Sequence, residues 1–95
     1  MSESQKLDQL KARRDAIDDI DNQVLQLVSK RAQLAHEIGG LKDDGVIYRP
    51  EREAQVLRRL IELNKGLLSA EAVTNIFRSI MSNCRALEKE LSVAF

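Results

Sequence analysis

The fold of this chain is restricted above all by a helical apolar pattern that runs from about Ser4 to about Asp43 without a proline. Apolar residues recur there at steps of mostly three and four, which places them near one face of a single helix. At 1.5 Å per residue this helix is about 60 Å long, whereas a compact chain of this length is about 32 Å across. The apolar stripe consists of Leu7, Leu10, Ile17, Ile20, Val24, Leu27, Val28, Leu34, Ala35, Ile38 and Leu41.

A stripe of this length would stay half exposed in a monomer of 95 residues. The simplest solution is a two-fold dimer in which the long helices pair and each chain covers part of the other. The alternative is a first helix that breaks. We favour the intertwined helical homodimer.

Two shorter helices follow, and no segment alternates for long enough to form a strand. The second helix should begin at Pro50 and end at the cap signature Asn64-Lys65-Gly66. The third should begin after the favoured N-cap residue Ser69 and end near Glu90. The sequence therefore predicts an all-α fold of three helices, one of them very long.

Composition excludes several classes of function. The 15 basic and 15 acidic residues balance and aromatic residues make up only 3%, which argues against a nucleic-acid partner. Cys84 is the single cysteine, so no intramolecular disulfide can form and a reducing cytoplasm is favoured. One cysteine and one histidine are too few for a structural zinc site. No apolar run approaches the ~20 residues that span a bilayer, so no membrane partner is expected.

Charged residues interrupt the apolar stripes of all three helices. Arg31 is flanked by stripe residues, and Lys42 points within about 20° of the same direction. Arg14 lies roughly 25 Å from Arg31 and is rotated by about 100°, so one straight helix cannot bring both to one small ligand. In a two-fold dimer, Arg14 could reach the site of the partner. Glu53 and Glu88 likewise lie on the apolar sides of the second and third helices.

These charges have two interpretations. Because buried unpaired charges are costly, they either pair with one another or line a cavity for a polar ligand. The excess of cations favours an anion, and two arginines favour carboxylates or phosphate. Alternatives remain open for each residue: Arg14 and Arg31 as snorkelling or ion-paired groups, Lys42 and Glu53 as partners of helix dipoles, and Glu88 as a surface residue.

Five short motifs together resemble the all-helical chorismate mutases, over about residues 7–90. The resemblance is to the mutase domain at the N-terminus of bacterial chorismate mutase–prephenate dehydratase proteins. It assigns residues 1–91 to a mutase domain and residues 92–95 to the start of a downstream dehydratase-like domain, covalently fused in the full-length protein. The motifs are Arg14-x-x-Ile17-Asp18-x-x-Asp21, Leu27-Val28-x-x-Arg31, Ile38-Gly39-x-x-Lys42, Tyr48-Arg49-Pro50-x-Arg52-Glu53 and Cys84-x-x-x-Glu88.

The resemblance implies the rearrangement of the dianion chorismate to prephenate, in phenylalanine and tyrosine biosynthesis, without a cofactor, a metal or a nucleophile. Such a reaction needs the substrate held in a compact conformer and negative charge stabilised on the ether oxygen. Carried over by position, Arg31 and Arg14 of the partner subunit clamp the two carboxylates, while Lys42 and Glu88 flank the ether oxygen. Glu53 accepts a hydrogen bond from the ring hydroxyl. The backbone around Arg49 assists Glu53, Arg52 supports the electrostatics near the site, and Cys84 lies where it could contact a carboxylate. The apolar walls of the pocket are formed by Ile38, Val56 and Met81.

Three positions depart from the family pattern. Glu88 stands where some relatives carry glutamine, and only a protonated glutamate can donate to the ether oxygen. Burial would raise the pKa of Glu88, whereas Lys42 would lower it. Arg49 stands where an acidic residue is common, which leaves it a backbone role. Cys84 is a weak donor where some relatives place a hydroxyl.

Two other functions remain to be distinguished. One is a pericyclic enzyme of the isochorismate pyruvate lyase type, which shares the helical scaffold and would release pyruvate from isochorismate. The other is a non-catalytic helical dimerisation or regulatory module, which would dimerise without turnover.

Overall fold

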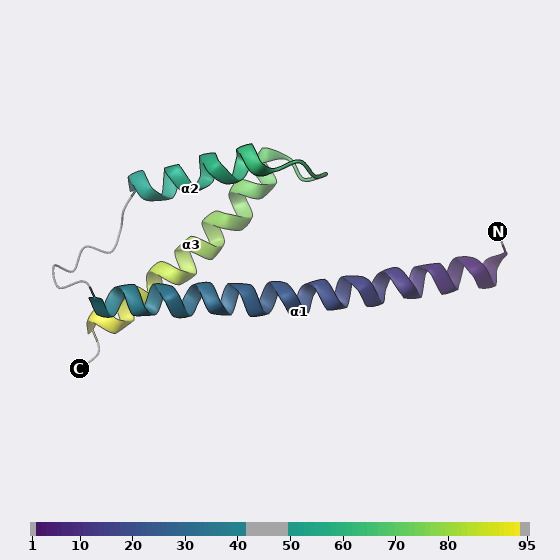
Figure 1. The fold of residues 1–95 in the computed structure, drawn as a ribbon, viewed down its shortest axis with the longest axis horizontal. Helices are drawn as coiled ribbons and strands as arrows, with labels where there is room; N and C mark the ends of the chain where they lie inside the picture. Colours follow the sequence, from purple (N-terminus) through teal and green to yellow (C-terminus); the bar gives the residue numbers. More distant parts are fainter. Residues whose placement is uncertain (1, 42–49, 94–95) are drawn as a thin grey trace. The chain divides into compact units, whose positions relative to one another are not determined.

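The computed structural model describes residues 2–41 and 50–93, with side chains in the last helix described as far as residue 87. Its elements are α1 (Glu3–Leu41), α2 (Pro50–Leu63) and α3 (Ala70–Val93) (Figure 1). Within the described residues all regular structure is helical, and α1 alone has 39 residues. The prediction of three helices with one very long member is therefore confirmed.

Helix α1 begins at a reciprocal cap. The Ser2 N–H donates to Gln5 Oε1 at 3.0 Å, and the Gln5 N–H donates to Ser2 Oγ at 3.2 Å. This arrangement satisfies two of the backbone donors that every helix start leaves unpaired. The helix thus starts one residue before the predicted Ser4, because Ser2 and Gln5 have the spacing of a capping box. The predicted stop around Asp43 lies outside the described residues.

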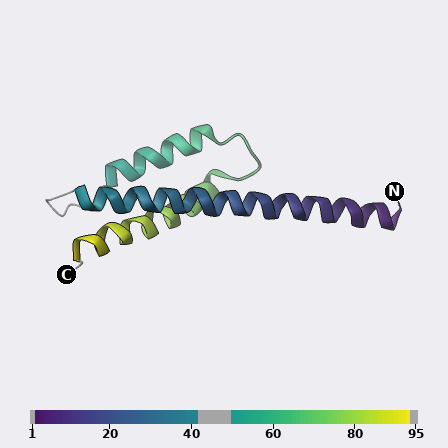
Figure 2. The same ribbon diagram turned by 60° about the horizontal axis from the view of Figure 1, so that its bottom comes forward.

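The connection between α2 and α3 is held by side chains that the sequence singled out. Asn64 Nδ2 donates to the Leu68 carbonyl at 2.7 Å, and the Gly66 N–H donates to Asn64 Oδ1 at 3.1 Å. Ser69 Oγ then accepts from the Ala72 N–H at 3.0 Å, as an N-cap does. Both predicted boundaries are confirmed, and this short link lets α3 turn back against α2 (Figure 2).

Helix α3 runs to Val93, three residues beyond the predicted end near Glu90. The sequence after Glu90 contains neither glycine nor proline, so no residue there stops a helix.

The chain forms two compact units, Met1–Lys30 and Arg31–Phe95, and α1 supplies residues to both. In the second unit α2 packs against α3. Among the residues whose side chains are described, the buried ones come from all three helices and all belong to the predicted apolar stripes. They are Ala35, Val56, Val73, Met81 and Cys84.

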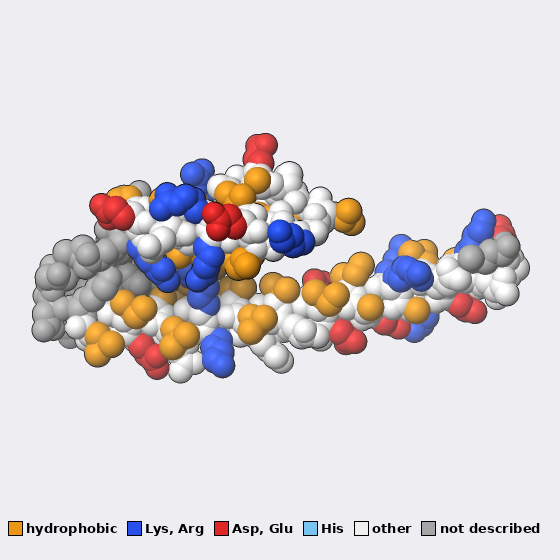
Figure 3. Space-filling view, turned by 45° about the horizontal axis from the view of Figure 1, so that its top comes forward, with side chains coloured by type: hydrophobic (Ala, Val, Ile, Leu, Met, Phe, Trp, Pro, Cys, Tyr) orange, Lys and Arg blue, Asp and Glu red, His pale blue; other side chains and the backbone are white. Residues whose placement is uncertain are grey.

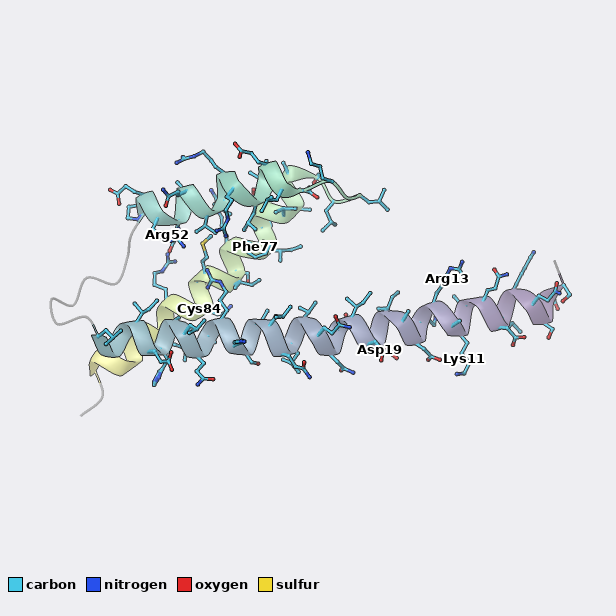
Figure 4. All side chains as sticks on the ribbon, in the orientation of Figure 1. Lys11, Arg13, Asp19, Arg52, Phe77 and Cys84 are labelled. Atoms are coloured by element: carbon cyan, nitrogen blue, oxygen red, sulfur yellow. The ribbon has the colours of Figure 1, made fainter. Side chains whose placement is uncertain are left out.

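The first unit carries an apolar surface. Apart from the half-buried Val28, its stripe residues stay exposed in the single chain, from Leu10 at 43% to Leu27 at 67%. Figure 3 shows hydrophobic side chains following one another along this part of α1, with charged side chains between them. Lys11 and Asp19 lie on one side of the helix and Arg13 on another (Figure 4). Lys11 also pairs with Asp15 at 3.0 Å, one turn away.

Candidate active site

A polar contact between helices joins Glu53 of α2 to Arg85 of α3. Arg85 Nη1 donates to Glu53 Oε2, across 32 positions of sequence. Glu53 lies in the first turn of α2, which Pro50 begins, and Arg85 follows the buried Cys84 in α3. The packing of α2 on α3 therefore places a predicted site residue in a partly buried ion pair.

An apolar surface lies beside this pair. Val56, one turn after Glu53, is buried, and so are Met81 and Cys84 on α3. Residues three or four positions apart share a face of a helix, so Val56 and Met81 lie on the same sides of α2 and α3 as the pair. The predicted apolar positions Val56 and Met81 are thus in the α2–α3 core. Ile38 on α1 remains 43% exposed.

Arg31 is the predicted site residue on the part of α1 that belongs to the second unit. Its side chain is half-buried, and Ala35, one turn later, is buried. Arg31 therefore borders the core of its unit.

In the single chain, the charged residues of the apolar stripes lie at the edges of the core, and their enclosure in a dimer stays a prediction. Among residues 2–41 and 50–87 of the single chain, no charged side chain is buried. Arg31, Glu53 and Arg85 are instead half-buried at the margins of the apolar surface. Partial exposure leaves charged groups in contact with water, which avoids the cost of burying them completely.

The other predicted polar residues are Arg52, Arg14, Lys42, Arg49 and Glu88. Arg52 is exposed and donates to Gln55 Oε1 at 3.3 Å within α2. Arg14 is exposed and belongs to the first unit. Lys42 and Arg49 lie outside the described residues, as does the side chain of Glu88, whose backbone belongs to α3.

Arg85 is a charged residue that sequence reasoning did not single out. It lies one residue after Cys84 and therefore about 100° away from the stripe position of that cysteine. Its four-residue spacing from Met81 was the available signal, because that spacing places Arg85 at the edge of the buried face.

Comparison with known proteins decides the family. The family model described as chorismate mutase type II matches residues 13–89. This chain belongs to the chorismate mutase type II family. The match spans parts of all three helices.

Individual relatives of this chain agree with this assignment. A bifunctional chorismate mutase/prephenate dehydratase from Neisseria gonorrhoeae is 52% identical over 93 residues, covering 97% of this chain and 26% of that protein. A chorismate mutase from Methanocaldococcus jannaschii is 34% identical over 80 residues, covering 81% of each. The chain thus spans about a quarter of the bifunctional relatives and most of the shorter one.

A solved structure has the same fold. The chorismate mutase from Helicobacter pylori, crystallised in complex with prephenate, matches with a TM-score of 0.85 and 27% sequence identity. The likeness covers 93% of this chain and 98% of that one. None of the described helices of the present chain is long and apolar enough to cross a membrane.

Proposed function

We propose that this chain catalyses the rearrangement of chorismate to prephenate. The observation that carries the proposal is the family match over residues 13–89, which includes five of the predicted catalytic and substrate-binding positions on described side chains. These positions are Arg14, Arg31, Arg52, Glu53 and Cys84. The likeness to a chorismate mutase crystallised with prephenate supports the same conclusion.

The reaction is intramolecular, so the protein needs to orient the substrate and stabilise charge in the transition state. In the proposed site, Arg31 binds one carboxylate of chorismate through its planar guanidinium. Lys42 and protonated Glu88 donate to the ether oxygen, on which negative charge develops. Glu53 accepts a hydrogen bond from the ring hydroxyl, and the buried Met81 contributes to an apolar wall that excludes water.

We further propose that the active molecule is a homodimer and that Arg14 of the partner subunit completes each site. The support is the apolar surface of the first unit, where Leu7, Ile17, Ile20 and Val24 are all at least half exposed in the single chain. A contiguous apolar stripe of this kind on a water-soluble helix marks an interaction surface. A second copy of the same stripe would cover it by two-fold symmetry.

The longer relatives suggest a wider context. Because the chain spans 26% of the bifunctional protein from Neisseria gonorrhoeae, we propose that a prephenate dehydratase domain follows it in the full-length protein. Residues 92–95 would then lead into that domain, which would act on the product of the mutase reaction. We place this activity in the cytoplasm, where a protein with one free cysteine stays reduced.

Mixed dimers test the shared site. Arg14→Ala and Arg31→Ala homodimers should each lose at least 100-fold in activity, because a substrate carboxylate loses a charge-assisted hydrogen bond. After equal mixing and subunit exchange, half of the dimers are hybrids, and each hybrid has one site with both arginines. The mixture should therefore regain about a quarter of the wild-type activity.

Arg13→Ala is the matched control, since Arg13 is an exposed neighbour that donates to the Gln9 carbonyl of its own helix at 3.4 Å. Its homodimer should retain wild-type activity. If mixing restores nothing although exchange is verified, the shared site is refuted. A wild-type chain that fails to convert chorismate refutes the mutase proposal itself, and pyruvate release from isochorismate would identify the lyase instead.

A further inference from the structure

The ion pair between Arg85 and Glu53 lies at the margin of the core. The Arg85 side chain is 32% exposed and that of Glu53 is 26% exposed. Ion pairs whose two side chains are both fully exposed contribute little to stability. Partly buried ion pairs hold their side chains in defined positions. The location of this pair therefore suggests a role in orientation.

The neighbours of the pair connect it to the proposed site. Met81, one turn before Arg85, is buried, and Val56, one turn after Glu53, is buried. Both apolar residues are predicted walls of the substrate pocket. The pair thus bridges α2 and α3 beside two positions that the proposed function assigns to the pocket wall.

We propose that Arg85 is a positioning residue for Glu53. Arg85 fixes the orientation of the Glu53 carboxylate, which accepts a hydrogen bond from the ring hydroxyl of the substrate. It also offsets the negative charge that this carboxylate presents to a dianionic substrate. The inference rests on the proposed function, in which Glu53 accepts that hydrogen bond.

The chemistry of the two groups supports this role. The bond from Arg85 uses Oε2 of Glu53. A carboxylate has about four acceptor sites on its two oxygens, so Glu53 retains capacity for a substrate hydroxyl. Without Arg85, the carboxylate would sample more orientations and would repel the incoming carboxylates of the substrate.

The test is a double-mutant cycle on the full chain, with kcat/KM for chorismate as the readout. Arg85→Gln should lower kcat/KM about fivefold in the wild-type background. In the Glu53→Gln background the same substitution should change kcat/KM less than twofold, because the group that Arg85 positions is already altered. Arg85→Lys should recover at least half of the lost activity, since it retains the charge.

Two further variants separate positioning from folding. Arg85→Leu places an apolar side chain at the helix interface and should fold while showing the same fivefold loss. Arg78→Gln removes an exposed arginine two turns earlier on α3 and should leave kcat/KM within twofold of wild type. Thermal unfolding measured for each variant reports whether the helices remain packed.

The outcomes distinguish the two proposals. If Arg85→Gln and Arg85→Leu leave kcat/KM unchanged, or lower it equally in both Glu53 backgrounds, the positioning role is overturned while the mutase activity stands. If the wild-type chain shows no turnover of chorismate, the proposed function fails and this inference fails with it.

Discussion

Truncating two isoleucines of the first unit should weaken dimerisation by about 100-fold. Ile17 and Ile20 are 55% and 54% exposed in the single chain. Complete burial of such a side chain is worth about 1.5–3 kcal/mol, so the exposed half of each represents about 1 kcal/mol. A dimer contains four of these side chains, and alanine retains part of each. The double variant Ile17→Ala/Ile20→Ala should therefore lose about 3 kcal/mol of association free energy, which is about a 100-fold rise in Kd.

Sedimentation equilibrium across a wide range of chain concentrations measures this change directly. Helix content should be followed by circular dichroism in the same samples, because alanine is a good helix former and should preserve α1. Loss of association with retained helix content is the expected result.

The matched control is Asp19→Ala, on the same stretch of α1. Asp19 is rotated by about 200° from Ile17, away from the apolar stripe, so this substitution should leave Kd within threefold of wild type. The reasoning is refuted if the wild-type chain sediments as a monomer throughout, or if the double isoleucine variant associates as tightly as the control.

Two further predictions concern helix capping and the pH dependence of turnover. Ser69→Ala removes the side-chain acceptor of the Ala72 N–H and should lower the free energy of unfolding by about 1 kcal/mol. In a thermal melt, Tm should therefore fall by about 4–8 °C. Ser82→Ala is the control and should leave Tm nearly unchanged, because Ser82 is exposed and lies in the middle of α3, away from its caps. Only protonated Glu88 can donate to the ether oxygen, so wild-type turnover of chorismate should fall as pH rises. Glu88→Gln carries an amide that donates at every pH, so this variant should show a flatter pH profile. An identical pH profile in both proteins would contradict the donor role.

Local sequence signals predicted the helices well. Pro50 and Ser69 mark the starts of α2 and α3 as expected, and Asn64 and Gly66 form the connection between them. These features are determined over three or four residues, through cap hydrogen bonds and through the restricted backbone of proline. The capping box at Ser2 was equally local, and its S-x-x-Q spacing was a readable signal for the earlier start of α1.

The apolar period also predicted which residues form the core. Val56, Met81 and Cys84 were placed on apolar stripes, and all three are buried. The same pattern placed Arg31 and Glu53 on the apolar sides, but it could not give their degree of burial. A stripe identifies a face of a helix, whereas the depth of a side chain depends on what packs against that face.

The sequence by itself determined that this chain is three helices with an apolar stripe on each, because caps and helical periodicity act between near neighbours. Only the tertiary structure decided that Arg85 pairs with Glu53, since 32 residues separate them and the contact exists only where α2 packs on α3. It likewise decided that Arg31 and Glu53 lie at the margin of the core in the single chain. Water at that margin solvates part of each charged group, which complete burial would prevent.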